Sequence, residues 1–169
     1  ERDGLRSAHQ ALEGDQKGAA GSASALTVGT TFGVSATVLR SCSVAATALA
    51  FGNYTPGTGG LSVNSTVNVK CTSGTTFAVA LDKGTTAGGL ISQRLMANGA
   101  NTLQYNLYTA AAFGTIFGDG TTGVTAPGTG VGLGTAVPIT VFGNLPDNAT
   151  NQGAVPGAYA DTIGVTVTY

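Results

Sequence analysis

Few side chains of this 169-residue chain have the chemistry of a catalytic site. His9 is the single histidine, and no Ser or Cys nucleophile is paired with it in a recognisable pattern, so we interpret it as an ordinary polar residue. The carboxylates after residue 17 are dispersed, and Asp82 and Asp119 stand in Asp-Lys-Gly and Asp-Gly sequences typical of turns. We therefore predict that the protein is not an enzyme.

Cofactor, metal and nucleic-acid sites are not indicated either. Glycines alternate with other residues from Gly128 to Gly134, but the lysine and helix of a phosphate-binding loop are missing. Two cysteines without histidines cannot form a structural zinc site. The net charge of −1 gives no support for nucleic-acid binding, and no apolar run approaches the roughly 20 residues of a membrane span. We expect no cofactor, no nucleic-acid partner and no membrane-spanning segment.

Cys42 and Cys71 are the only cysteines. An even pair in a chain rich in Gly and Thr favours one disulfide and an oxidising compartment, and two buried free thiols are the alternative. Closing a loop of about 30 residues would stabilise the fold by roughly 3–4 kcal/mol.

The charged residues are concentrated at the N-terminus, where residues 1–17 carry seven of the 15. Leu5, Ala8 and Leu12 lie at helical spacing, so a short helix or a mobile arm fits residues 1–17, and residues 18–24 are predicted to be a flexible linker. We assign residues 1–24 to an N-terminal extension.

The longest alternating pattern follows directly, over residues 26–38. Its odd positions are small or polar, and its even positions are apolar or Thr: Leu26, Val28, Thr30, Phe32, Val34, Ala36 and Val38. A period of two indicates a strand with one buried face. This strand belongs either to the chain's own domain or to the sheet of a neighbouring molecule.

Further alternations predict strands along the rest of the chain. Their inward residues are Cys42, Val44, Ala46 and Ala48; Leu61, Val63, Val67, Val69 and Cys71; Phe77, Val79 and Leu81; Leu103, Tyr105 and Leu107; Val137, Ile139 and Val141; and Ile163, Val165, Val167 and Tyr169. We expect turns or loops at residues 51–57, 84–89, 114–134 (with a short strand near 115–117) and 146–157, and a short apolar island at Arg94-Leu95-Met96.

This pattern predicts an all-β fold, an antiparallel β-sandwich. The chain ends on an apolar alternating strand and carries a long one near its start. Such strands present exposed edges that pair readily with another chain.

Short blocks in this order resemble the spore coat protein U domain family, which includes subunits of archaic, Csu-type chaperone–usher pili. The blocks are Cys42-x-Val44, Leu49-x-Phe51-Gly52-x-Tyr54, Val67-x-Val69-x-Cys71, Arg94-x-Met96, Leu103-x-Tyr105-x-Leu107-Tyr108, Gly118-Asp119-Gly120, Val141-Phe142-Gly143 and the run Gly157-x-Tyr159-x-Asp161-Thr162-Ile163-x-Val165-x-Val167-x-Tyr169. Two departures are Phe117, where the family often has Trp, and the longer, charged extension at residues 1–24.

The resemblance implies an incomplete immunoglobulin-like sandwich, at residues 39–169, that is completed by a donor strand from a neighbouring subunit. Residues 25–38 would then be the donor segment, and Ile163, Val165, Val167 and Tyr169 would form an edge of the acceptor groove. It further implies a major pilin that assembles into a homopolymer with a periplasmic chaperone and an outer-membrane usher. The expected location is an extracellular, adhesive cell-surface pilus.

Three alternatives stay open from the sequence. The chain could be a tip adhesin whose Gly-rich loops contact a surface, although tip subunits usually carry a further N-terminal domain for which we expect no room. It could be a coat or envelope monomer completed by its own N-terminal strand. Residues 26–38 could also be a long first strand of the chain's own domain.

Overall fold

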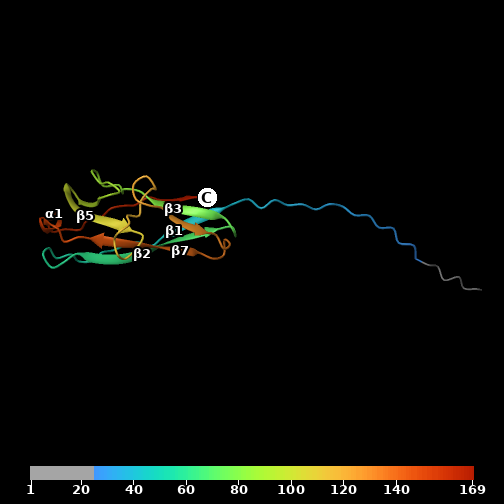
Figure 1. Cartoon of the computed structure of the whole chain (residues 1–169), viewed down its shortest axis with the longest axis horizontal. Coiled ribbons are helices and arrows are strands. Elements are labelled where there is room, and N and C mark those ends of the chain that lie inside the picture. The colour runs from blue at the N-terminus through green and yellow to red at the C-terminus, as the bar shows by residue number, and fades with distance from the viewer. Residues whose placement is uncertain (1–24) are drawn as a thin grey trace, which may run out of the picture. The chain divides into compact units, whose positions relative to one another are not determined.

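The computed structural model describes residues 25–169, and it divides into two units between Thr37 and Val38. The predicted features of residues 1–24, including His9, lie outside the described residues. The second unit is an antiparallel β-sandwich-like fold (Figure 1), which confirms the predicted fold class. The predicted boundary after residue 38 stays a prediction.

Two sheets make up this unit within the described part of the chain. One has the strand order β1-β2-β7-β5-β4, and the other has the order β6-β3-β8. The elements are β1 Cys42–Ala46, β2 Leu61–Cys71, β3 Thr76–Leu81, β4 Arg94–Asn98, β5 Asn101–Tyr108, β6 Ala126–Thr129, β7 Val137–Leu145, the helical turn α1 Ala149–Gln152, and β8 Val165–Thr168.

The core lies between the two sheets. Alternate side chains of a strand point to the same face of its sheet, so every second residue of these strands faces the core. Most inward positions predicted for β2, β3 and β5 are buried, among them Val69, Val79 and Leu107, whereas Leu61 and Val63 at the start of β2 are half-buried. They pack with Phe117, Val141 and other residues into one cluster. The regular alternation of apolar residues therefore gave these strands and their buried faces correctly.

Four local predictions differ at least in part from the structure. β1 ends at Ala46 and does not bury its even positions, since Val44 is 42% exposed at the sheet edge. Only the end of the turn predicted at residues 51–57 is a turn, at residues 56–58, and residues 51–55 have no regular secondary structure. The region 114–134 contains β6, whose Gly128 lies flat against the ring of Phe77. The loop 146–157 contains α1, which begins at the side chain of Asn148.

Residues 25–41 contain no helix and no strand, and their side chains are exposed. Val28 is 100% exposed and Phe32 is 86% exposed. The alternating pattern of residues 26–38 is therefore not used in a hydrogen-bonded strand of the described chain.

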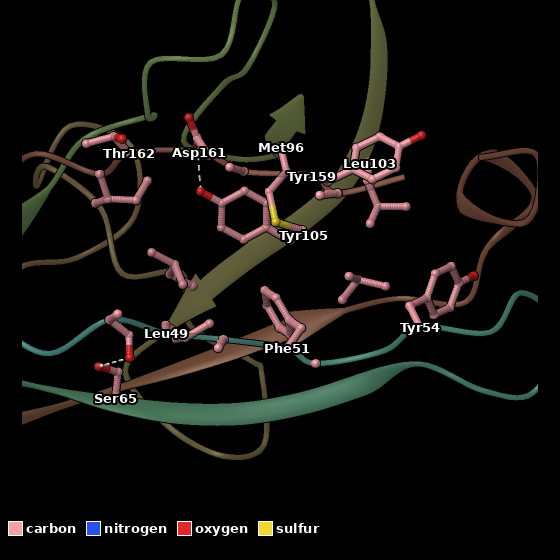
Figure 2. Close-up of a pocket in the computed structure, with 18 of the residues that line it drawn as sticks. Leu49, Phe51, Tyr54, Ser65, Met96, Leu103, Tyr105, Tyr159, Asp161 and Thr162 are labelled. Atoms are coloured by element: carbon pink, nitrogen blue, oxygen red, sulfur yellow. Dashed lines mark hydrogen bonds between the residues drawn. The ribbon is translucent and has the colours of Figure 1, made fainter. Parts of the chain in front are cut away.

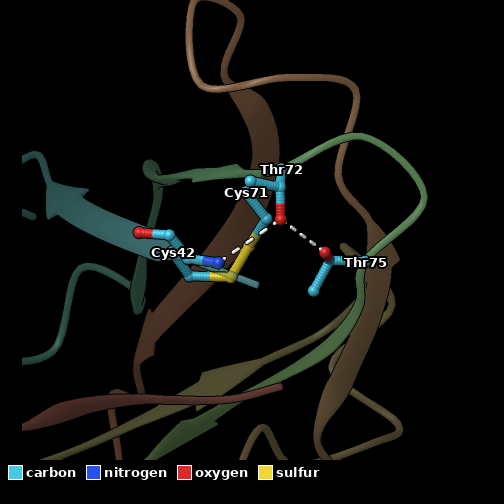
Figure 3. The surroundings of a disulfide bond; sticks show 5 residues. Cys42, Cys71, Thr72 and Thr75 are labelled. Atoms are coloured by element: carbon cyan, nitrogen blue, oxygen red, sulfur yellow. Dashed lines mark hydrogen bonds between the residues drawn. A yellow bond between two sulfur atoms is a disulfide. The ribbon is translucent and has the colours of Figure 1, made fainter. Parts of the chain in front are cut away.

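The predicted disulfide is present between Cys42 and Cys71, the first residue pair of the β1–β2 ladder (Figure 3). The same corner is tied by hydrogen bonds, because Thr72 N donates to Ser41 O and the Thr72 and Thr75 hydroxyls lie 2.7 Å apart. The disulfide therefore attaches the exposed edge strand to the buried strand β2 at the point where the chain enters the sandwich.

Replacing both cysteines with serine should lower the free energy of unfolding by roughly 3–4 kcal/mol, because the denatured chain loses the constraint of the closed loop. Urea unfolding of the oxidised wild-type and double-serine proteins measures this. A Ser41→Ala, Ser43→Ala double variant next to the bridge is the control and should unfold as the wild type does. A loss below 1 kcal/mol would contradict the expected role of the bridge.

Candidate functional site

A groove of about 1190 Å³ opens along one side of the sandwich. Residues 46–54, which begin at the last residue of β1, form its first rim, and residues 154–165, which end at the first residue of β8, form its second rim. Its floor comes from the core side chains of both sheets. Figure 2 shows Leu49, Phe51 and Tyr54 on one side of the groove and Tyr159 and Asp161 on the other, with Tyr105 between them.

The groove is lined mainly by apolar side chains. Leu103, Tyr105 and Leu107 reach its floor from β5, and Met96 reaches it from β4. Apolar surface of this extent is usually covered in a soluble protein, so an open groove of this kind indicates a binding surface.

The first rim has an unpaired backbone edge. Thr47 N donates to Thr66 O at 3.0 Å, and beyond it no hydrogen bond of the described chain uses the backbone N–H or C=O groups of residues 49–54. Backbone N–H and C=O groups are strong hydrogen-bonding groups, so these are free to pair with water or with an incoming strand.

The second rim has the alternation of an edge strand. Thr162 O and Gly164 O accept from Thr85 N and Asp82 N, while the backbone groups of Asp161 and Ile163 make no hydrogen bond within the described chain. One side of this segment is thus paired with the body of the sandwich and the other side is free, as in an edge strand that another strand can extend.

A carboxylate ties the end of the first rim to the loop before α1. Asp147 accepts from the Tyr54 hydroxyl at 2.6 Å and from the backbone N–H groups of Gly57 and Gly59 at 3.0 and 2.9 Å. The hydrogen bond from Tyr54, followed by that from Gly57, lowers the pKa of Asp147 to about 2.

Tyr54→Phe should raise the pKa of Asp147 toward its ordinary value of 3.8, because the hydroxyl provides the largest stabilisation of the carboxylate. A carboxyl with a lowered pKa contributes stability that is complete above its unfolded pKa, near 4, and is lost as the pH falls toward 2. Titration of the Asp147 carboxyl carbon by NMR measures the change. Tyr159→Phe removes a hydroxyl bound to Val155 O and should leave this titration unchanged; an unchanged titration in Tyr54→Phe would refute the assignment.

A second carboxylate holds the second rim. Asp161 accepts from the hydroxyl of Tyr105 at 2.7 Å and from the backbone and side chains of Thr85 and Thr86. Burial alone would raise the pKa of Asp161, but the hydrogen bonds from Tyr105 and Thr86 outweigh it and the pKa is lowered. Burial, with the hydrogen bond to Asp161, raises the pKa of Tyr105.

Arg94, predicted as part of an apolar island, is instead a fully buried cation, and this is a further correction. Its guanidinium donates to the carbonyls of Leu81, Asp82 and Phe117 and to Asn106 Oδ1, over 2.7–3.3 Å. Burial lowers its pKa. A basic residue at the start of a short apolar island was the signal for this cluster. The guanidinium joins β3, β4, β5 and the Phe117 segment, which support the floor and the second rim.

Of the four residues predicted to form the groove edge, two line the groove and two do not. Ile163 and Val165 line the groove, whereas Val167 is half-buried further along β8 and Tyr169 is 52% exposed after its end.

Sequence reasoning missed the first rim, because its segment was assigned to a turn. The predicted donor residues, Leu26 to Val38, are exposed. Their roles as donor strand and groove edge stay predictions.

Residues 25–169 contain no group of three side chains suited to hold a metal ion. No helix in that part of the chain is long and apolar enough to cross a membrane.

Comparison with known proteins identifies a family that matches the chain and a solved structure with a similar fold. The model of the Spore Coat Protein U domain matches residues 28–166. The fold resembles a chain in the crystal structure of the CsuC–CsuE chaperone–tip adhesion subunit pre-assembly complex from archaic chaperone–usher Csu pili of Acinetobacter baumannii, with a TM-score of 0.56 and 21% identity. The match covers 79% of this chain and 41% of that chain, so this protein spans about two fifths of its length. No curated protein matches the sequence.

Proposed function

The chain belongs to the Spore Coat Protein U domain family, and on this basis we propose that it is a structural pilus subunit that polymerises head to tail by donor-strand exchange. The family consists of structural and adhesive proteins, and the chain is not an enzyme. Residues 26–34 of one subunit are the strand that fills the groove of the next subunit.

One observation carries the proposal: the chain presents an apolar groove with two free backbone edges and also an exposed alternating segment of the kind that fills such a groove. Residues 26–34 have as many residues as the first rim, 46–54. Their apolar even positions would enter the groove, and their backbone would pair with the free groups of both rims.

The energetics favour such a complex. Full burial of each of Leu26, Val28, Phe32 and Val34 contributes about 1.5–3 kcal/mol. Association and ordering of the strand oppose this by several kcal/mol. The added row of backbone hydrogen bonds makes a long-lived contact the expected result.

Head-to-tail contacts explain a filament. The donated segment and the groove are different surfaces of one chain, so each subunit has one of each to offer, and a contact that does not close on itself extends indefinitely. A periplasmic chaperone would cover the groove before assembly, an outer-membrane usher would direct assembly, and the product would be an extracellular pilus. The similarity to a chain of a chaperone–subunit complex supports the chaperone as a partner.

Negative-stain microscopy of the intact protein tests the proposal, with gels run in SDS before and after boiling. Thin filaments, and a ladder that collapses to monomer only on boiling, are the expected results. A monomer that melts cooperatively and forms no filament even with its chaperone and usher would overturn the proposal and favour a sandwich completed by its own N-terminal strand.

A further inference from the structure

Tyr105 lies in the floor of the groove and contacts both rims. Its ring packs edge to face against Phe51 of the first rim, with ring centroids 6.0 Å apart. Its hydroxyl donates to Asp161 of the second rim at 2.7 Å. Figure 2 shows the ring between these two residues, and the side chain is 5% exposed.

The two oxygens of Asp161 have separate partners. Oδ1 accepts four hydrogen bonds from the backbone and hydroxyl groups of Thr85 and Thr86, at 3.0–3.2 Å. Oδ2 accepts the bond from Tyr105. A Cβ atom at Gly84 would overlap this carboxylate, so the loop packs closely against it. The carboxylate therefore joins the second rim to both the 84–86 loop and the floor.

No backbone hydrogen bond of the described chain joins one rim to the other, although Ala160, Thr162 and Gly164 of the second rim pair with the body of the sandwich. The backbone of residues 49–54 makes no hydrogen bond within the described chain, and neither does the backbone of residues 156–159. The separation of the rims consequently depends on side-chain contacts such as those of Tyr105. A groove with its rims already in place loses less conformational entropy when a strand enters.

We propose that Tyr105 is a positioning residue for strand uptake, with its ring holding the first rim and its hydroxyl, through Asp161, holding the second. This inference rests on the proposed function and deepens it. The hydroxyl and the ring act on different rims, so removing them separately gives different results.

The test uses the full-length chain with Val28→Asp and Phe32→Asp, which disable its own donor segment, and a fluorescent synthetic peptide of residues 25–38 as the probe. Tyr105→Phe and Tyr105→Leu are compared in this background. Tyr108→Phe is the matched control, because Tyr108 lies on the same strand and its hydroxyl makes no hydrogen bond within the described chain. Two readouts are used: the conformational exchange of residues 46–54 and 154–165, from backbone 15N NMR relaxation dispersion, and the rates of peptide association and dissociation.

Tyr105→Phe should increase exchange in the second rim alone and slow peptide association about tenfold, with dissociation unchanged, because the hydrogen bond acts before the strand is bound. Tyr105→Leu should increase exchange in both rims. Tyr108→Phe should behave as the parent protein does.

Peptide binding at an unchanged rate in Tyr105→Phe, or an equal rise of exchange throughout the sandwich, would overturn the role of Tyr105 while leaving the proposed function intact. If the peptide does not bind the parent protein at all, the proposed function fails, and strand uptake fails with it. The exchange pattern then still shows whether Tyr105 holds the two rims.

Discussion

Replacing Val28 and Phe32 with aspartate will give a folded subunit that forms no filaments. These side chains are 100% and 86% exposed within the chain, so their replacement leaves the sandwich unaffected. In the groove of a neighbour, each change removes about 1.5–3 kcal/mol of apolar burial. It also places a carboxylate among apolar side chains, which is more costly than the lost burial. Microscopy and SDS gels without boiling measure filament formation, and circular dichroism measures the melting temperature.

The matched control is Thr27→Asp with Thr31→Asp. It adds the same charge to the same segment, but at the odd positions, which face away from the groove if the even positions enter it. The control should form filaments as the wild type does. Equal loss of filaments in both variants would mean that charge in the segment, and not the identity of its apolar face, prevents assembly. Filaments from the Val28, Phe32 variant would exclude residues 26–34 as the donor strand.

Arg94→Met should cost on the order of 3–5 kcal/mol of unfolding free energy, the largest stability loss we expect from one substitution. The thioether fills part of the space but donates nothing, so the carbonyls of Leu81, Asp82 and Phe117 lose the guanidinium as donor. The amide oxygen of Asn106 keeps only its hydrogen bond from Leu107 N. Each unpaired buried acceptor costs about 1–3 kcal/mol, and removal of the buried charge offsets part of the total. Urea unfolding of the oxidised protein measures the change.

Arg40→Met is the control, because it makes the same change at an exposed position before β1. It should alter stability by less than about 0.5 kcal/mol. Arg94→Lys should fall between the two, since an ammonium group reaches fewer of the acceptors than the planar guanidinium. If Arg94→Met were as stable as Arg40→Met, the hydrogen-bond cluster would contribute nothing net to the fold.

The strands of the sandwich were predictable where apolar residues alternate without interruption. In β2, β3, β5 and β7 the inward residues are buried or half-buried, so the local pattern and the tertiary environment agree. The disulfide was predictable for the same reason, since Cys71 continues the inward face of β2.

The first rim and the Arg94 cluster were not predictable in this way. The first rim forms no backbone pairing of its own beyond Thr47. Phe51 and Tyr54 stand within a turn-like sequence, residues 51–57, and so gave no strand signal. The partners of Arg94 are mostly carbonyl groups, which every residue has, and only the tertiary structure determines which of them converge on the guanidinium.

By itself the sequence determined the fold class, the inward faces of the main strands and the unusual character of residues 26–38, because all three depend on a period of two in neighbouring residues. Only the tertiary structure decided that a groove opens between residues 46–54 and 154–165, and that Tyr105 contacts both sides of it. These segments are about 100 residues apart in the chain, and their spacing depends on how the two sheets pack, which no local pattern specifies.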